Sequence, residues 1–229
     1  MPIPATHTEI EQIYLAAEMN HCRSVCITGC SASDGVTSIA TALTERYLLA
    51  GHQTLLVDLN MLHPAFEELD MVIGDTEEHW VEHKETHQLF TGLTIPTDRS
   101  TQLAYKDPNN LQKAVQLWLT RFDRVIIDTS PILKINRGNI PAQSVASACD
   151  KTILVVRGGT TTSSQLTKAV ELLQSERISL LGTILNVKDQ PTLAQEIIRE
   201  LRRLRLIPQK LRLSIERRLT AIEMLSQSA

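Results

Sequence analysis

Residues 29–38 have the composition and the setting of a phosphate-binding loop. They follow a short apolar run that ends at Ile27, and an apolar helical pattern comes after them. A strand, a loop of small residues and a helix in this order hold an anion with backbone N–H groups and the helix N-terminus. The lysine that such loops carry is missing, because Val36 follows Gly35, and the loop contains no lysine or arginine. The stretch therefore predicts a phosphate loop without its cation.

Two aspartates that follow apolar runs are candidates to complete a site around this loop. Asp58 comes directly after Leu55–Val57, and Asp128 directly after Val125–Ile127. The carboxyl ends of parallel strands meet at one edge of an open α/β sheet, where such sheets bind ligands. A carboxylate there can hold a hydrated Mg²⁺ or orient a water molecule, and the Thr37 hydroxyl would complete the metal shell. For either aspartate alone, the alternative is a strand-end carboxylate that caps the next helix.

The elements that must position these residues alternate between strand and helix patterns. Consecutive apolar residues indicate parallel strands covered on both faces, and apolar residues at helical spacing indicate helices. Strands are expected at 25–28, 53–58, 93–95, 125–128, 152–156 and 180–186, and helices at 8–19, 37–49, 111–119, 140–148 and 164–176. This alternation predicts an α/β fold like that of the P-loop NTPases, a doubly wound, mostly parallel sheet with helices on both faces.

The pattern is weak between residues 61 and 88. An exposed helix at 77–88 would place His79, His83 and His87 on one face. Three imidazoles at this spacing can bind a metal ion. The glutamates and the lysine around them favour a solvated face instead.

Cysteine usage and hydropathy indicate the compartment. Cys22, Cys26 and Cys30 are spaced by four, but they run from a strand into a loop, so buried thiols are favoured over metal ligands. The sequence has no run of eighteen or more apolar residues, and its first twenty residues lack a basic start followed by an apolar core. The expected location is the cytoplasm, with a peripheral position at the inner membrane as an option.

Charge is distributed unevenly along the chain. Residues 199–229 contain eight Arg or Lys and three Glu, a net charge of +5 on a chain whose total is −3. We expect a P-loop NTPase-like domain at 1–190 and a basic tail at 191–229, in which Pro208 separates two amphipathic helical patterns. Packing on the body or on a protein partner is favoured for this tail. The alternative is an anionic membrane surface, bound through residues 199–218.

Five segments, in this order, resemble the bacterial tyrosine kinases of capsule and exopolysaccharide export, within the ParA/MinD-like class of P-loop ATPases. Residues 29–38 resemble the Walker A loop S-x-x-x-G-E-G-K-[ST]-T of that family. Residues 55–64 resemble L-L-I-D-A-D-x-R-x-P, and residues 122–131 resemble Y-D-Y-V-I-I-D-T-P-P. Residues 154–161 and 181–186 match the later strands of the family. The resemblance covers about residues 20–188.

Several positions depart from the family pattern. Val36 replaces the phosphate-binding lysine, Ser33 replaces the first glycine of the loop, Asn60 replaces the second aspartate of the second motif, and Leu62 stands at its arginine. The N-terminal E-x-x-R-x-x-R pattern, which the family uses in ring assembly, is not met by residues 9–15. The tail contains no tyrosine, whereas those kinases phosphorylate a C-terminal tyrosine cluster.

The resemblance implies a set of site residues. Asp58 and Asp128 would be the catalytic pair if the protein is active, and together with Thr37 they would hold Mg²⁺. ATP or ADP would be held by the loop and by an asparagine near the adenine, which correspond to Ser33, Asp34, Gly35, Val36, Thr37, Ser38 and Asn186.

The free energy of a hydrogen bond to phosphate and the rate effect of transition-state charge indicate which activities survive the loss of the lysine. A charged hydrogen bond to phosphate contributes about 1.5–3 kcal/mol, so its loss weakens binding roughly ten- to a hundredfold. Loss of preorganised charge in the transition state lowers the rate on the order of 10²–10³-fold. Binding of ATP or ADP with Mg²⁺, weakened or lost, is therefore expected to persist better than phosphoryl transfer, for which Asn60 is a second loss. An arginine from elsewhere, or from a neighbouring subunit, could substitute.

These observations predict a catalytically impaired, tyrosine-kinase-like P-loop protein of exopolysaccharide or capsule export. It would act by binding a partner, such as a membrane polysaccharide copolymerase or another protein of the export complex. One alternative is an active ATPase or protein tyrosine kinase with a variant Walker A loop, and another is a ParA/MinD-type positioning protein. A homo-oligomer is also an option, and no nucleic acid partner is expected.

Overall fold

The structure is a computed structural model that describes residues 3–69, 79–136, 138–187 and 198. The helices are α1 (Thr8–Met19), α2 (Val36–Leu49), α3 (Arg99–Ala104), α4 (Pro108–Trp118), α5 (Ala142–Ala148) and α6 (Ser163–Ser175). The strands are β1 (Ser24–Gly29), β2 (Thr54–Leu59), β3 (Phe66–Leu69), β4 (Trp80–His83), β5 (Leu89–Leu93), β6 (Arg124–Thr129), β7 (Lys151–Arg157) and β8 (Leu180–Asn186).

The strands form one sheet in the order β3-β4-β5-β2-β6-β1-β7-β8. The pairs β2–β5, β2–β6, β1–β6 and β1–β7 are parallel, whereas β3–β4 and β4–β5 are antiparallel. Strands β1 and β2 are buried along their whole length, as their consecutive apolar residues predict. The predicted doubly wound, mostly parallel α/β sheet is confirmed.

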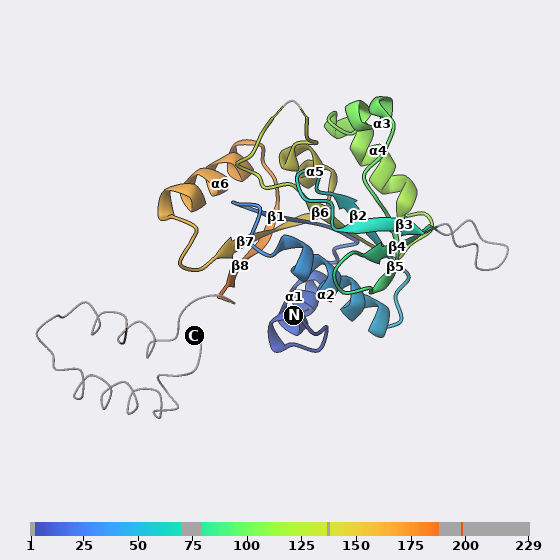
Figure 1. Ribbon diagram of the computed structural model, residues 1–229, viewed down its shortest axis with the longest axis horizontal. Coiled ribbons are helices and arrows are strands. Elements are labelled where there is room, and N and C mark those ends of the chain that lie inside the picture. The colour runs from blue at the N-terminus through green and yellow to red at the C-terminus, as the bar shows by residue number, and fades with distance from the viewer. Residues whose placement is uncertain (1–2, 70–78, 137, 188–197, 199–229) are drawn as a thin grey trace, which may run out of the picture. The chain divides into compact units, whose positions relative to one another are not determined.

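Helices cover the sheet on both faces. In Figure 1, α1 and α2 lie on one side of the strands, and α3, α4, α5 and α6 lie on the other. Each side has its own apolar cluster. One includes Ile10, Ile39 and Leu43 under α1 and α2, and the other includes Leu111 and Val145 under α4 and α5. The sheet is thus held rigidly between two cores, which fixes the ends of its strands.

The chain divides into two compact units. The first contains residues 1–156 and 161–184, and the second contains residues 157–160 and 185–229. The predicted division into 1–190 and 191–229 stays a prediction. The interpretation of the basic tail falls outside the described residues, which include only Ile198 of it.

The region between residues 61 and 88 differs from its prediction. The helix expected at 77–88 is wrong where the structure describes it, because Trp80–His83 is the strand β4. Strands β3, β4 and β5 form an antiparallel meander at one edge of the sheet. Val81 and Phe90 are opposite one another in this meander and are buried in the cluster under α2, which gives the strands their anchor. β5 also begins earlier than the strand expected at 93–95.

The three histidines of this region therefore do not share a helical face. His79 Nδ1 lies 3.0 Å from a Glu68 carboxylate oxygen, and His87 Nδ1 lies 2.6 Å from one of Glu82. His83 packs edge-on against Phe66. Within the described residues, no group of three His, Cys, Asp or Glu side chains is arranged to hold a metal ion.

Other local predictions are confirmed. Asp107 caps α4, since its carboxylate accepts a hydrogen bond from the Asn109 N–H at 2.8 Å. Cys22, Cys26 and Cys30 are free, buried thiols.

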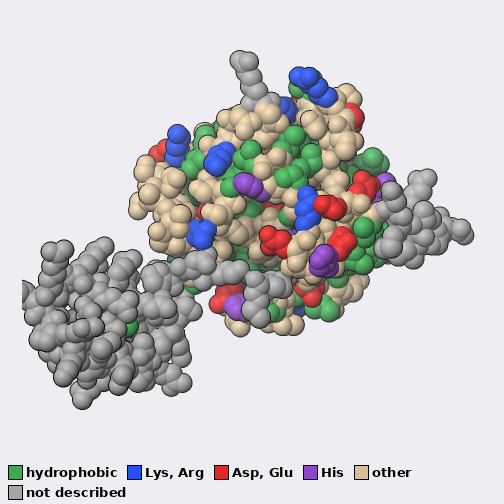
Figure 2. All heavy atoms as spheres, in the orientation of Figure 1, with side chains coloured by type: hydrophobic (Ala, Val, Ile, Leu, Met, Phe, Trp, Pro, Cys, Tyr) green, Lys and Arg blue, Asp and Glu red, His purple; other side chains and the backbone are tan. Residues whose placement is uncertain are grey.

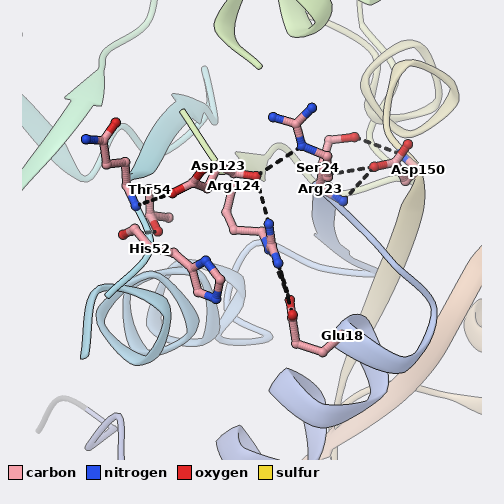
Figure 3. Close-up of polar contacts among 9 residues, drawn as sticks. Glu18, Arg23, Ser24, His52, Thr54, Asp123, Arg124 and Asp150 are labelled. Atoms are coloured by element: carbon pink, nitrogen blue, oxygen red, sulfur yellow. Dashed lines mark hydrogen bonds and ion pairs between the residues drawn. The ribbon is translucent and has the colours of Figure 1, made fainter. Parts of the chain in front are cut away.

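The amino ends of the strands are joined by a network of polar contacts (Figure 3). One carboxylate oxygen of Asp150 accepts hydrogen bonds from the main-chain N–H groups of Arg23 and Ser24, each at 2.8 Å. Both carboxylate oxygens of Glu18 accept from Arg124, at 2.8 and 2.9 Å. The network connects α1, β1, β6 and the start of β7 at the end of the sheet opposite to the loop 29–38.

The surface of the described residues is mixed in character. On the face shown in Figure 2, acidic and basic side chains are interspersed. None of the described helices is both long enough and apolar enough to cross a bilayer.

Candidate phosphate-binding site

The loop between β1 and α2 is tightly folded. Gly35 lies at the N-cap of α2 with φ = 96°, a left-handed conformation that favours glycine. A Cβ atom on Gly29 would lie 3.0 Å from both Asp34 Cβ and Val36 Cγ2, so this close approach also requires glycine. The Gly29 carbonyl accepts a hydrogen bond from the Ile132 N–H at 2.9 Å, which ties the loop to the segment after β6.

Asp34 shapes the loop from inside. Its side chain is buried, and its Oδ2 accepts a hydrogen bond from the Ser31 N–H at 2.8 Å. The Asp34 N–H donates in turn to the Ser31 carbonyl at 3.2 Å. Asp34 therefore acts on the loop backbone, and it is not among the residues that line the adjoining pocket.

A pocket of about 180 Å³ opens over this loop. Its lining comes from the loop, from the residue after β2 and from the end of β6, and consists of Ser31, Ala32, Ser33, Gly35, Val36, Thr37, Asn60, Thr129 and Pro131. The lining thus includes four of the predicted cofactor-binding residues, and it contains no lysine or arginine among the described residues. Ser38 is not part of this lining.

Val36 belongs to the pocket wall and to the core at the same time. Its side chain is only 6% exposed and packs in the cluster that contains Ile27 and Ile39. The position at which a phosphate loop carries its cation is therefore filled by an apolar group that helps to seat α2 on β1.

Thr37 and Asp128 are joined directly. The Thr37 hydroxyl donates to Asp128 Oδ2 at 2.5 Å, and Asp128 is completely buried. Burial and the neighbouring charge of Asp58 hold the pKa of Asp128 well above its usual range, and the hydrogen bond from Thr37 opposes this shift. The sequence prediction that loop and strand end meet at this point is thus reflected in a contact.

Asp58 is in register with Asp128 across β2 and β6. Its Oδ1 accepts a hydrogen bond from the Asn60 N–H at 2.8 Å, and its Oδ2 accepts one from the Ala65 N–H at 3.0 Å. Burial raises the pKa of Asp58 to about 6, against the effect of these amide donors. The carboxylate closes the turn between β2 and β3, a structural task that the sequence pattern did not reveal.

The residues present fit a magnesium ion. Asp128 Oδ1 is buried and has no hydrogen-bond partner among the described residues. This carboxylate oxygen is therefore available to a metal ion, and the Thr37 hydroxyl lies beside it. Carboxylate and hydroxyl oxygens are the donors that Mg²⁺ takes from phosphate-loop proteins. Asp128 and Thr37 would hold the ion, which would neutralise phosphate charge. Both carboxylate oxygens of Asp58 already accept hydrogen bonds from main-chain N–H groups. The role of Asp58 as a magnesium ligand therefore stays a prediction.

Asn60, Thr129 and Pro131 were not among the predicted site residues. Asn60 is 5% exposed, and its Oδ1 accepts a hydrogen bond from the His63 N–H at 3.3 Å. Its place directly after the β2 carboxyl end is the signal that identifies it.

Asn186 ends β8 in the second unit, where its carbonyl accepts from the Gly158 N–H at 2.9 Å. Its predicted place near an adenine stays a prediction.

A second cavity, of about 300 Å³, lies at the other end of the sheet, beside α4 and β5. It is lined mainly by apolar side chains, among them Leu55, Leu93, Leu117, Trp118 and Phe122. It contains none of the residues predicted for the nucleotide site, and His79 of the three histidines considered above is part of its lining.

Comparison with known proteins agrees with this geometry. No protein-family model matches the chain. The tyrosine-protein kinase YwqD of Bacillus subtilis is 29% identical over an alignment of 180 positions, which covers 72% of this chain and 73% of that protein.

Solved structures show the same fold. The kinase domain of the Escherichia coli tyrosine kinase ETK aligns with a TM-score of 0.57 and 17% identity, over 80% of this chain and 75% of that one. The septum site-determining protein MinD of Pyrococcus horikoshii, complexed with Mg-ADP, aligns with a TM-score of 0.53 and 16% identity, over 84% of this chain and 76% of that one. In sequence the chain resembles the bacterial tyrosine-protein kinases, and it has the P-loop fold that their kinase domains share with MinD-like ATPases.

Proposed function

We propose that the chain binds Mg·ADP or Mg·ATP at the loop 29–38 and transfers phosphate weakly or not at all. It would act in the assembly or export of a surface polysaccharide by binding a partner, the cytoplasmic end of a membrane polysaccharide copolymerase. Under this proposal the protein lies in the cytoplasm, at the inner face of the membrane. The proposal rests on the similarity to bacterial tyrosine-protein kinases and on the chemistry of the loop.

One observation carries the proposal: the pocket opens at the N-terminus of α2, where an anion can bind, but its lining contains no cation among the described residues. The α2 N-terminus, the loop amides and the Thr37–Asp128 pair are all present, and Val36 fills the lysine position. A phosphate can still bind to N–H groups and to Mg²⁺. The preorganised positive charge that accelerates transfer is absent, a loss on the order of 10²–10³-fold in rate.

Binding and turnover can be measured separately on the purified protein. Calorimetric titration with Mg·ADP should give a measurable dissociation constant. ATP hydrolysis and tyrosine phosphorylation should not exceed those of the Asp128→Asn variant, which lacks the carboxylate. Turnover clearly above that variant would contradict the impaired chemistry, and no uptake of Mg·ADP would contradict the nucleotide site.

An active ATPase or protein tyrosine kinase is the second candidate. The intact contact between Thr37 and Asp128, with one Asp128 oxygen left over for a metal ion, favours it. An arginine supplied by the partner would then replace the missing lysine. Under this alternative, addition of the cytoplasmic segment of the copolymerase raises turnover by orders of magnitude, whereas under our proposal it does not.

A further inference from the structure

We infer that the cavity beside α4 and β5 is a second ligand site, which takes a small amphiphilic anion, an apolar body that carries one carboxylate. The apolar lining holds the body of this ligand, and the Arg121 guanidinium holds its carboxylate. The inference goes beyond the proposed function and does not rest on it. The cavity lies at the other end of the sheet from the loop 29–38 and shares no lining residue with the pocket there.

The floor of the cavity comes from two parallel strands. Leu56 of β2 is in register with Gly92 of β5. Leu55 and Thr91, one residue earlier in each strand, therefore lie side by side, and Leu93 follows on the same face as Thr91. Leu55 and Leu93 belong to the apolar cluster under α4 and α5. The floor is thus part of a packed core and has a fixed shape.

The facing wall is the C-terminal end of α4 with the turn that follows it. Its lining residues are Leu117, Trp118, Arg121 and Phe122. The Arg23 guanidinium holds this turn, since it donates to the main-chain carbonyls of Leu119 at 2.8 Å and Phe122 at 3.1 Å. It also donates to the Asp123 carbonyl at 3.4 Å, as Figure 3 shows. The wall is therefore preformed, as it is in most sites for small molecules.

The size and the lining of the cavity suit a small ligand with an apolar body. The volume of about 300 Å³ is at the lower end of the range of small-molecule sites. Trp118 is held by Tyr105, whose ring lies edge-on at 6.2 Å between centroids. Leu117 is 66% exposed beside it, so apolar surface at the cavity is in contact with water. A ligand that covers this surface gains the free energy of burying it.

Arg121 supplies a cation for one carboxylate. The side chains of Arg23 and Arg124, at the same end of the sheet, are bound to main-chain carbonyls and to Glu18. The Arg121 side chain makes no ion pair or hydrogen bond with another described residue. The cavity lining contains no Asp or Glu that could neutralise it. A guanidinium binds a carboxylate through two parallel hydrogen bonds, so an anionic group is expected at this position.

The test uses decanoate, a fatty acid of medium length, as the probe. Trp80 and Trp118 are the two tryptophans of the chain, so the full chain with Trp80→Phe reports on Trp118 alone. Decanoate below its micelle concentration should change the fluorescence of Trp118 saturably. Arg121→Gln in this background should weaken decanoate binding at least about fivefold, because a charged hydrogen bond is lost. Decanol, which has the same body without the charge, should bind equally well with and without this change.

Two further variants in the same background locate the site. Thr91→Phe places an aromatic ring in the cavity and should abolish the response to decanoate. Lys113→Gln removes an exposed charge from α4 outside the lining and should leave the affinity unchanged within about twofold. Circular dichroism confirms that each variant is folded. Arg121 is exposed, so its variant keeps the test valid if Thr91→Phe does not fold.

Three results would overturn the inference. The first is a Trp118 fluorescence that does not respond saturably to decanoate. The second is equal binding of decanoate by Thr91→Phe or by Arg121→Gln, because the anion would then bind elsewhere or without the guanidinium. The third is a concentration-dependent dimer of the full chain in sedimentation that Leu117→Ser abolishes. That result would assign the apolar surface to a second copy of the chain.

Discussion

At the scale of single residues, the most unusual feature is the pair of aspartates beside the loop. Asp58 and Asp128 lie in register on adjacent strands, each at most 1% exposed, with no cation in the pocket lining that they flank. Two neighbouring carboxyl groups in a low dielectric resist simultaneous ionisation. The pair therefore prefers to keep a proton, and an incoming cation such as Mg²⁺ would displace it.

The pair predicts an unusual pH dependence of stability. Because the pKa of Asp58 is raised from 3.8 to about 6, the folded protein binds more protons than the unfolded chain in that interval. The free energy of unfolding should then fall as the pH rises through this interval, by about 3 kcal/mol in total for this group alone between a pH well below 4 and a pH well above 6. Burial of Asp128 extends the decline to higher pH. Urea unfolding without Mg²⁺ at pH 4, 5, 6.5 and 8 measures this.

Asp128→Asn separates the pair from other groups. The variant removes one buried charge and keeps an oxygen for the Thr37 hydroxyl, so at pH 8 it should be more stable than the parent protein. The exposed helix cap Asp98 is the control with the opposite sign, since its hydrogen bonds lower its pKa to about 2. Asp98→Asn should therefore lose stability at pH 8. A parent protein equally stable from pH 5 to 8 would contradict this account.

The candidate site shows which contacts can be predicted from the sequence pattern and which cannot. Asp58 and Asp128 follow apolar runs, and strand ends meet at one edge, so the register of the two aspartates and the contact of Asp128 with Thr37 could be predicted from the sequence. The bonds of Asp58 to the Asn60 and Ala65 amides could not, because they depend on the backbone path of the turn after β2. The side chain of Asn60 enters the pocket wall for the same reason.

At the scale of elements, the meander β3–β4–β5 extends the sheet at the edge next to β2. The β1, β2, β6 and β7 strands could be predicted because each contains a run of consecutive apolar residues and is almost completely buried. The meander strands are four or five residues long and each anchors through few buried side chains, such as Val81 and Phe90. Such short half-buried strands leave no periodicity that distinguishes them from an exposed helix.

Gly92 is the residue on which the meander depends. A Cβ atom there would lie 2.5 Å from Val81 Cγ2 and 2.6 Å from the Leu56 carbonyl oxygen, so β4 and β2 would have to move. Gly92→Ala should lower the free energy of unfolding by about 1–3 kcal/mol, the usual effect of overpacking. Gly182→Ala is the matched control in β8, because a Cβ there meets no atom within 4 Å. Thermal or urea unfolding compares the two, and an equal loss in both variants would contradict the steric argument.

At the scale of the whole molecule, charge is separated along the chain. Residues 199–229 carry a net +5, whereas the total is −3, so the remainder carries an excess of negative charge. The interspersed charges on the face of the body shown in Figure 2 give that face no comparable basic patch. Attraction to an anionic surface, if it occurs, is therefore expected from the tail.

Vesicle binding tests this expectation. The full chain should co-sediment with phosphatidylglycerol vesicles at low ionic strength and be released by high salt. Changing Arg202, Arg203 and Arg205 to serine should weaken binding strongly, since each basic residue near the surface contributes about 1 kcal/mol. Changing Lys113, Arg121 and Lys168 to serine removes the same charge from the body. If both triple variants bind as the parent protein does, the tail is not a membrane anchor.

The position of β1 has a consequence for how the chain folds. β1 pairs only with β6 and β7, about one hundred residues or more further along. During synthesis from the N-terminus, the loop 29–38 is made early, but both neighbours of its strand are made late. Because such distant pairings are slow to form, refolding should be slow and nearly all-or-none for this half of the sheet. The pocket over the loop 29–38, beside which Gly29 contacts Ile132 and Thr37 contacts Asp128, should thus be among the last features to acquire its shape.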